Sequence, residues 1–304
     1  MKTAWFLLGA LLTCVPSTQL LAQQAAYELS LVDLDGKRTV LGKLPDSVFA
    51  PRVAPDGKRF AFELRDEKPV NGTTPERVWI ADLKKPDKRR SLPMVGTGRN
   101  WAPMWSHDGE RVIFLVSGSG PDALWWRRAD GSGDAERLVE ALSAEGLSPD
   151  GRELTFITVS GDRDYGISKL NLATKAQAVV IDRPRSEQHS SIISPDGRWI
   201  AYASNETGRH EIWVEPFAGG GKRYVVSSGG GSHPLWSPDG SHLYFDREDR
   251  LFSVSLSFKD DIPKAVEQKE LPIAGFQQGY RRRQFDLMPD GQHFLMLFPR
   301  GSRY

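Results

Sequence analysis

Short apolar runs recur along the whole chain, and a few turn-forming residues separate each run from the next. The runs are rich in β-branched and aromatic side chains. Leu235-Trp236 precedes one Pro-Asp-Gly turn, for example, and Leu243-Tyr244-Phe245 follows it. Runs of this composition, bounded by turn residues, predict β-strands. The pattern therefore predicts an all-β protein.

One tight turn recurs six times. Its copies are Pro55-Asp56-Gly57, His107-Asp108-Gly109, Pro149-Asp150-Gly151, Pro195-Asp196-Gly197, Pro238-Asp239-Gly240 and Pro289-Asp290-Gly291. Proline presets φ, aspartate tolerates the next position and glycine accepts a positive φ, so each copy predicts a hairpin. A period of about 40 to 50 residues between strand-flanked turns is typical of a β-propeller. Six unrelated turns in a β-sandwich would leave the repetition of the flanking runs unexplained.

The count of strands predicts how the repeat array closes. A second strand pair follows each of the first five turns, whereas only Phe294 to Phe298 follows the sixth. Two further strand-like runs, Tyr27–Val32 and Arg38–Leu41, lie near the N-terminus. We therefore expect residues 23–304 to form a single six-bladed β-propeller of four-stranded blades. Its N-terminal strands complete the last blade, so that no strand edge is open at the seam.

The first 22 residues have the composition of a secretory signal peptide. Lys2 precedes the apolar run Ala4–Leu12, and Ala22 supplies a small residue at a cleavage site. The alternatives are a lipoprotein signal cleaved before Cys14 and a retained anchor, although the apolar run is shorter than the roughly 20 residues of a membrane span. We expect a periplasmic or secreted protein.

Composition narrows the chemistry of the exported chain. Cys14 is the only cysteine, so cleavage of the signal leaves no disulfide and no thiolate. The formal net charge of +1 falls to about zero once Lys2 is removed, which argues against a general nucleic-acid surface. The six turns leave no gap wide enough for a second domain.

Two segments carry a family resemblance. Ile193–Ser204 (ISPDGRWIAYAS) and Pro234–Gly240 (PLWSPDG) resemble the blade motif of the WD40-like, TolB-type propellers, which belong to the periplasmic Tol-Pal system. The stretch from Ile212 to Gly291 is also similar to the extracytoplasmic propellers of certain bacterial membrane kinases. TolB has an additional N-terminal α/β domain and those kinases have a kinase domain, and neither is expected here. The resemblance implies a fold and a binding role without catalytic residues, and no G-x-S-x-G hydrolase elbow occurs.

Propellers usually bind ligands at the axial mouth, through the loops that enter the innermost strands. We place these loops six to eight residues before each turn aspartate. They contain Phe49, Asn100, Trp101, Ser143, His189, His233, Arg283 and Gln284. The binding residues we select are Trp101, His189, His233, Arg283 and Gln284. This set suits a peptide terminus, an acidic glycan or a metal ion.

His189 and His233 stand at near-equivalent places in adjacent blades and could share a metal ion if both rings face the axis. A catalytic site would need a third ligand, for which Gln284 and Glu187 are the candidates. Otherwise both histidines bond to neighbouring loops. The remaining histidines are expected to be surface or capping residues: His107, His210, His242 and His293. We expect no resident metal or cofactor.

The sequence predicts an exported, monomeric, non-enzymatic binding module that docks an envelope protein or peptide at its axial mouth. Nucleic acid is not an expected partner. One alternative is a metal-dependent propeller enzyme, such as a polysaccharide lyase or a lactone hydrolase. A second alternative is a sensor module for a separate signalling chain.

Overall fold

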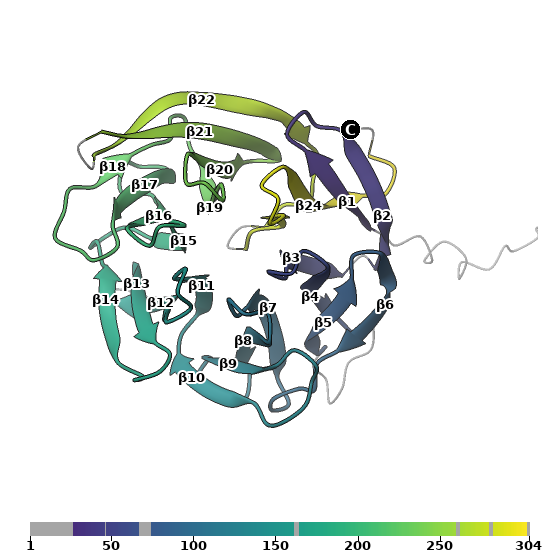
Figure 1. The fold of residues 1–304 in the computed structure, drawn as a ribbon. Coiled ribbons are helices and arrows are strands. Elements are labelled where there is room, and N and C mark those ends of the chain that lie inside the picture. Colours follow the sequence, from purple (N-terminus) through teal and green to yellow (C-terminus); the bar gives the residue numbers. More distant parts are fainter. Residues whose placement is uncertain are drawn as a thin grey trace, which may run out of the picture.

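A computed structural model describes residues 27–45, 47–66, 74–160, 164–259, 262–279 and 282–302. Six four-stranded antiparallel sheets surround a central axis, as Figure 1 shows. The six-bladed all-β prediction is therefore confirmed. The predicted signal peptide, residues 1–22, lies outside the described residues. Within the described ranges, no helix has the length and apolar character needed to cross a membrane.

Each blade runs from an innermost strand at the axis to an outermost strand at the rim. Blade 1 contains β3 (Val48–Val53), β4 (Arg59–Arg65), β5 (Glu76–Asp82) and β6 (Lys85–Ser91). Blade 2 contains β7 (Arg99–Trp105), β8 (Arg111–Ser117), β9 (Ala123–Arg128) and β10 (Glu136–Glu140). Blade 3 contains β11 (Ser143–Leu147), β12 (Glu153–Ser160), β13 (Asp164–Asn171) and β14 (Gln177–Ile181).

The other three blades have the same arrangement. Blade 4 contains β15 (Gln188–Ile193), β16 (Trp199–Ser204), β17 (Glu211–Pro216) and β18 (Tyr224–Val225). Blade 5 contains β19 (Ser232–Trp236), β20 (His242–Arg247), β21 (Arg250–Lys259) and β22 (Ile262–Ala274). Blade 6 contains β23 (Phe285–Leu287), β24 (His293–Pro299), β1 (Tyr27–Asp33) and β2 (Arg38–Leu44).

Blade 6 joins the two ends of the described chain. β1 pairs antiparallel with β24 from Tyr27, opposite Pro299, to Asp33, opposite His293. In Figure 1 the purple strands β1 and β2 accordingly lie beside the yellow strand β24. The prediction that the N-terminal strands complete the last blade is confirmed, and the pairing satisfies edges that would otherwise be open.

The six turns share one hydrogen-bonded geometry. Each turn glycine has a φ between 64° and 74°, and its N–H donates to the carbonyl three residues earlier at 2.8–2.9 Å. Each turn aspartate accepts, on Oδ1, the backbone N–H two residues later at 2.8–3.0 Å. The aspartates are therefore structural, as the sequence predicts.

The turns also form a ring at one end of the axis. Each turn glycine faces the first residue of the turn in the preceding blade. The six contacts are Gly57 with Pro289, Gly109 with Pro55, Gly151 with His107, Gly197 with Pro149, Gly240 with Pro195 and Gly291 with Pro238. The last blade thus contacts the first through the same positions of the repeat as any other neighbouring pair.

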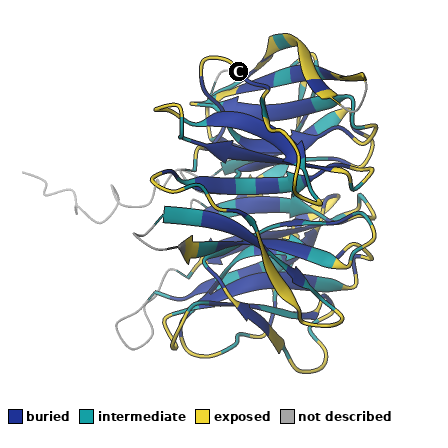
Figure 2. Ribbon diagram, turned by 90° about the vertical axis from the view of Figure 1, so that its left-hand side faces the viewer, coloured by how far each residue is buried: buried dark blue, intermediate teal, exposed yellow. Residues whose placement is uncertain are grey.

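The hydrophobic core lies between blades rather than inside any one of them. Val214 of blade 4 packs in one cluster with Phe245 of blade 5, and Phe62 of blade 1 packs in another with Leu297 of blade 6. Figure 2 shows the buried residues within the strands and the exposed residues at the turns and rims. Burial of one such side chain contributes about 1.5–3 kcal/mol, so each blade depends on its neighbours for stability.

Two glycines test how tightly the ring of turns is packed. Gly57→Ala should lower the free energy of unfolding by about 1–2 kcal/mol, because alanine is strained at a positive φ. Gly291 has nearly the same φ, but a Cβ there would lie 2.8 Å from Cδ of Pro238, against 3.6 Å for the nearest atom at Gly57. Gly291→Ala should therefore lower the free energy of unfolding by about 1–3 kcal/mol more than Gly57→Ala does. Urea denaturation measures the free energy of unfolding of both variants, and equal losses would contradict tight packing between the turns of blades 5 and 6.

Candidate functional site

The innermost strands begin with an irregular backbone at the end of the axis opposite the turns, which we call the mouth. Residues with positive φ occupy the position six before the turn aspartate in four blades: Ala50, Ala102, Ser190 and His233, with φ of 50–57°. The pairing register with the second strand shifts at the same places. Such bulges change the direction of neighbouring side chains. The expectation that Trp101, His189 and His233 lie in loops is wrong, because all three lie in bulged strands.

A cavity of about 300 Å³ opens at the mouth. The ends of blades 2, 3 and 4 supply most of its wall. Its polar residues include Trp101, Asp122, Glu145, Glu187, His189 and Arg282. Leu142, Ile157 and Tyr165 form an apolar wall. The cavity thus combines aromatic, apolar and charged groups of both signs, the lining that fits a peptide segment better than a uniformly charged ligand.

Trp101 is held in place from several sides. Its Nε1 donates to Oγ of Ser117 at 2.9 Å. The guanidinium carbons of Arg282 and Arg99 lie 4.2 Å and 4.7 Å from the centre of a Trp101 ring, within the range of cation–π attraction. Arg282 also pairs with the buried Glu63. The indole is therefore presented to the cavity in a fixed orientation.

Three imidazoles lie close together, and one of them, that of His189, lines the cavity. The ring of His189 lies 4.7 Å from that of His210 and 6.1 Å from that of His233, centre to centre. Burial lowers the pKa of His210, although Glu187 acts in the opposite direction. This contact was not predicted, because the sequence placed His210 among surface or capping residues.

His233 is turned away from the mouth cavity. Its side chain is only 3% exposed, and Nδ1 lies 2.9 Å from Oδ1 of Asp246 on β20. Over the described ranges, no three His, Cys, Asp or Glu side chains are placed to hold a metal ion together. The metal hypothesis for His189 and His233 therefore finds no third ligand in this arrangement.

Gln284 is not available to a ligand either. It is 4% exposed, and its Oε1 accepts the N–H of Ala50 at 2.9 Å across the seam between blades 6 and 1. Arg283 pairs with Asp286 at 3.1 Å, and its carbonyl accepts from Arg52. Burial, together with the charge of Arg283, lowers the pKa of Arg52 to about 9. Of the selected residues, Trp101 and His189 line the mouth cavity, and Arg283 lines two other cavities, of about 60 Å³ and 340 Å³.

Glu145 was missed by the sequence analysis. It lines the mouth cavity and also two cavities below it, of about 60 Å³ and 340 Å³. Burial raises the pKa of Glu145 to about 7, opposed by hydrogen bonds that include the N–H of Ser191 at 2.9 Å. The sequence does set Glu145 apart. It stands five residues before its turn aspartate, at a position that is proline in blades 1, 2 and 5.

Sequence comparison gives distant relatives. No protein-family profile matches the chain. An uncharacterized peptidase of Bacillus subtilis, YuxL, is 25% identical over 228 residues, which are 72% of this chain and 31% of that protein. An uncharacterized protein of Agrobacterium fabrum, Atu1656, is 25% identical over 199 residues, 64% of this chain and 53% of that protein. The chain thus spans about a third to a half of the curated relatives it matches.

Comparison of structures places the fold with the TolB-type propellers. A TolB candidate from Agrobacterium tumefaciens superposes with a TM-score of 0.68 at 17% identity, covering 91% of this chain and 99% of that one. TolB from Acinetobacter baumannii gives a TM-score of 0.59 at 17% identity, covering 84% of this chain and 67% of that one. A manganese-bound oligogalacturonate lyase and a periplasmic gluconolactonase of Pseudomonas aeruginosa share the fold at TM-scores of 0.55. The fold therefore occurs in both TolB proteins and enzymes.

Glu145 makes the stability of the protein depend on pH. Its pKa in the folded state, about 7, lies above the 4.5 of an ordinary glutamate, so folding favours the protonated form. Between these values the folded state binds more protons than the unfolded state, and stability falls as the pH rises. Glu145→Gln is neutral throughout and keeps an oxygen that can accept from Ser191. In urea denaturation, the free energy of unfolding of this variant should fall less steeply between about pH 5 and about pH 8 than that of the parent protein. An equally steep fall in both proteins would contradict the raised pKa of Glu145.

Proposed function

We propose that the chain is an exported, non-enzymatic propeller that binds a protein or peptide partner at the mouth cavity. The observation that carries the proposal is the fixed pair of Trp101 and Arg282 at the edge of a partly apolar cavity. Tryptophan and arginine are the residues most enriched among those that dominate binding energy at protein interfaces.

The way in which Trp101 is held supports this role. Its bond to Ser117 and its contacts with two guanidinium groups fix the indole before any partner arrives. A side chain that is already ordered loses little conformational entropy on binding. The carboxylates of Asp122 and Glu187 supply acceptors for backbone N–H groups or for a cationic side chain of the partner.

The fold and the N-terminal sequence support an envelope location. The TolB proteins share the propeller, and the gluconolactonase that shares it is a periplasmic protein. The composition of residues 1–22 is that of a secretory signal. We therefore propose that the partner is another protein of the cell envelope and that the propeller acts as a monomer.

One observation favours a metal-dependent enzyme as the second candidate. The Nε2 atoms of His210 and His233 are buried without a hydrogen-bond partner among the residues that the structure describes, and both rings lie near His189. Imidazole nitrogens are common ligands of transition metals. A metal ion bound there would require rearrangement of the side chains to bring three ligands together, so we rank this candidate below partner binding.

Photo-crosslinking in the native envelope tests the proposed function. A photo-reactive amino acid at position 101 should capture one dominant protein, since this position lies at the edge of the mouth cavity. Trp101→Ala should weaken binding of the captured partner about 10- to 100-fold, as expected for a dominant interface residue. The measurements are mass spectrometry of the adduct and titration with the purified partner.

Trp126 provides a matched control on the outer part of blade 2. Its Nε1 also donates to a side chain, Glu136, and a guanidinium group, that of Arg111, also lies over its ring. A crosslinker at position 126 should give no dominant adduct, and Trp126→Ala should bind the partner normally. Equal capture from both positions would overturn the mouth assignment. Absence of any adduct at 101, with a metal ion bound to the purified protein, would favour the enzyme.

A further inference from the structure

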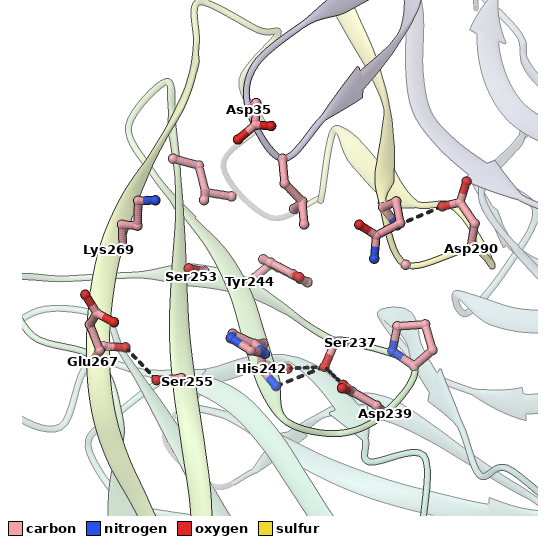
Figure 3. Close-up of a pocket in the computed structure, with 15 residues that line it drawn as sticks. Asp35, Ser237, Asp239, His242, Tyr244, Ser253, Ser255, Glu267, Lys269 and Asp290 are labelled. Atoms are coloured by element: carbon pink, nitrogen blue, oxygen red, sulfur yellow. Dashed lines mark hydrogen bonds between the residues drawn. The ribbon is translucent and has the colours of Figure 1, made fainter.

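A second cavity, of about 510 Å³, opens at the turn end of the molecule between blades 5 and 6. Figure 3 shows it with Tyr244 near its centre and charged side chains around it. One wall comes from β20, β21 and β22 of blade 5. The other comes from the turn between β1 and β2 and from the turn at Asp290. We call this cavity the inter-blade groove.

Tyr244 departs from the pattern of the repeat. Its position, five residues after the turn aspartate, has aliphatic residues or threonine in the other blades: Ala61, Ile113, Thr155, Ala201 and Leu295. The Tyr244 side chain is fixed by an edge-on contact with Phe294 of blade 6, with ring centres 5.1 Å apart. The residue is only 5% exposed, yet it lines the groove, and its hydroxyl has no hydrogen-bond partner among the described residues. The hydroxyl of a largely buried side chain that reaches a cavity without a partner is available to a ligand.

The groove has an excess of negative charge. Four carboxylates line it, and Lys269 is the one lysine or arginine among its lining residues. The hydrogen bonds of their turns lower the pKa of Asp239 and Asp290, so both are anionic at neutral pH. In the described part of the chain, the carboxylates of Asp35 and Glu267 make no side-chain hydrogen bond or ion pair. This distribution attracts a cation.

The groove also has an apolar strip. Leu34 and Leu271 line it beside the carboxylates, and Leu271 is buried. An alkylammonium ion matches both features, because its methylene stem covers apolar surface while its ammonium group offers three donors.

We propose that the inter-blade groove binds an alkylammonium cation, supplied by a free polyamine or by a lysine side chain of a partner. The ammonium group lies in the groove beside Tyr244 and is attracted by the carboxylates of Asp35 and Glu267, which Figure 3 shows at separate places on the wall. The stem lies over Leu34 and Leu271. This site is separate from the mouth cavity, at the other end of the axis.

The corresponding groove between blades 2 and 3 lacks these features. It has a volume of about 440 Å³, but Arg111 and Arg152 balance the carboxylates of Asp108 and Asp150. The position of Tyr244 is occupied there by Ile113. The molecule therefore contains a related groove that should not bind the same cation.

Isothermal titration of the whole protein with spermidine, and separately with a short lysine peptide, tests the proposal at physiological salt. At least one of the two probes should bind, and comparison of the two separates a free polyamine from a lysine side chain. The double variant Asp35→Asn/Glu267→Gln should weaken binding about tenfold or more, because charge-assisted hydrogen bonds are lost. Tyr244→Phe should weaken it by a smaller factor, and Lys269→Gln should strengthen it by removing a like charge.

Controls make each outcome decisive. Glu110→Gln/Asp134→Asn changes the net charge equally but alters exposed residues of blade 2, so it should bind the probes as the parent protein does. Trp101→Ala should also bind them normally, which keeps this test independent of the mouth. The proposal is overturned if neither probe binds, if the two double variants lose affinity equally, or if Lys269→Gln weakens binding.

Discussion

The fold depends on the fact that no blade can bury its own apolar side chains. Each four-stranded sheet has apolar residues on both faces, and the clusters that contain Val214, Phe245 and Phe62 are each formed by two adjacent blades. Every blade therefore needs two neighbours, and a ring is the arrangement in which all six have them. The contacts between turn glycines and the preceding prolines repeat this requirement at one end of the axis.

The mouth is shaped by bulges near the starts of four inner strands. In blades 2 and 5 these bulges place Ala102 and His233 at positive φ. The bulge divides neighbouring side chains between two environments. Trp101 and His189, seven residues before their turn aspartates, line the cavity, whereas His233, six residues before its own, pairs with Asp246 inside blade 5. A shift of one position along the strand thus separates a cavity-lining residue from one buried inside a blade.

This division explains what the sequence could and could not predict. The structure of each turn depends only on residues next to one another in the sequence, and Asp239 and Gly240 form the same hydrogen bonds as their counterparts in the other blades. The strands and the number of blades could therefore be predicted from the spacing of the turns. The seam was predictable because an incomplete blade leaves unpaired strands. The burial of His233 and Gln284 was not predictable in this way, because a bulge changes side-chain direction without any change in composition. Gln284 closes the seam through Ala50, a residue more than 230 positions away, and no local pattern contains that contact.

The pairing of β1 with β24 also has a consequence for how the protein reaches its native state. Loop-closure entropy makes contacts between distant segments slow to form. Tyr27 of β1 meets Pro299 of β24 across more than 270 intervening positions, so β1 and β2 must wait for β24 to be synthesised. Until then, blade 6 lacks half of its sheet, and blades 1 and 5 each expose one apolar face. Rapid pairing of β1 with β24 would therefore shorten the time during which these faces are open to aggregation.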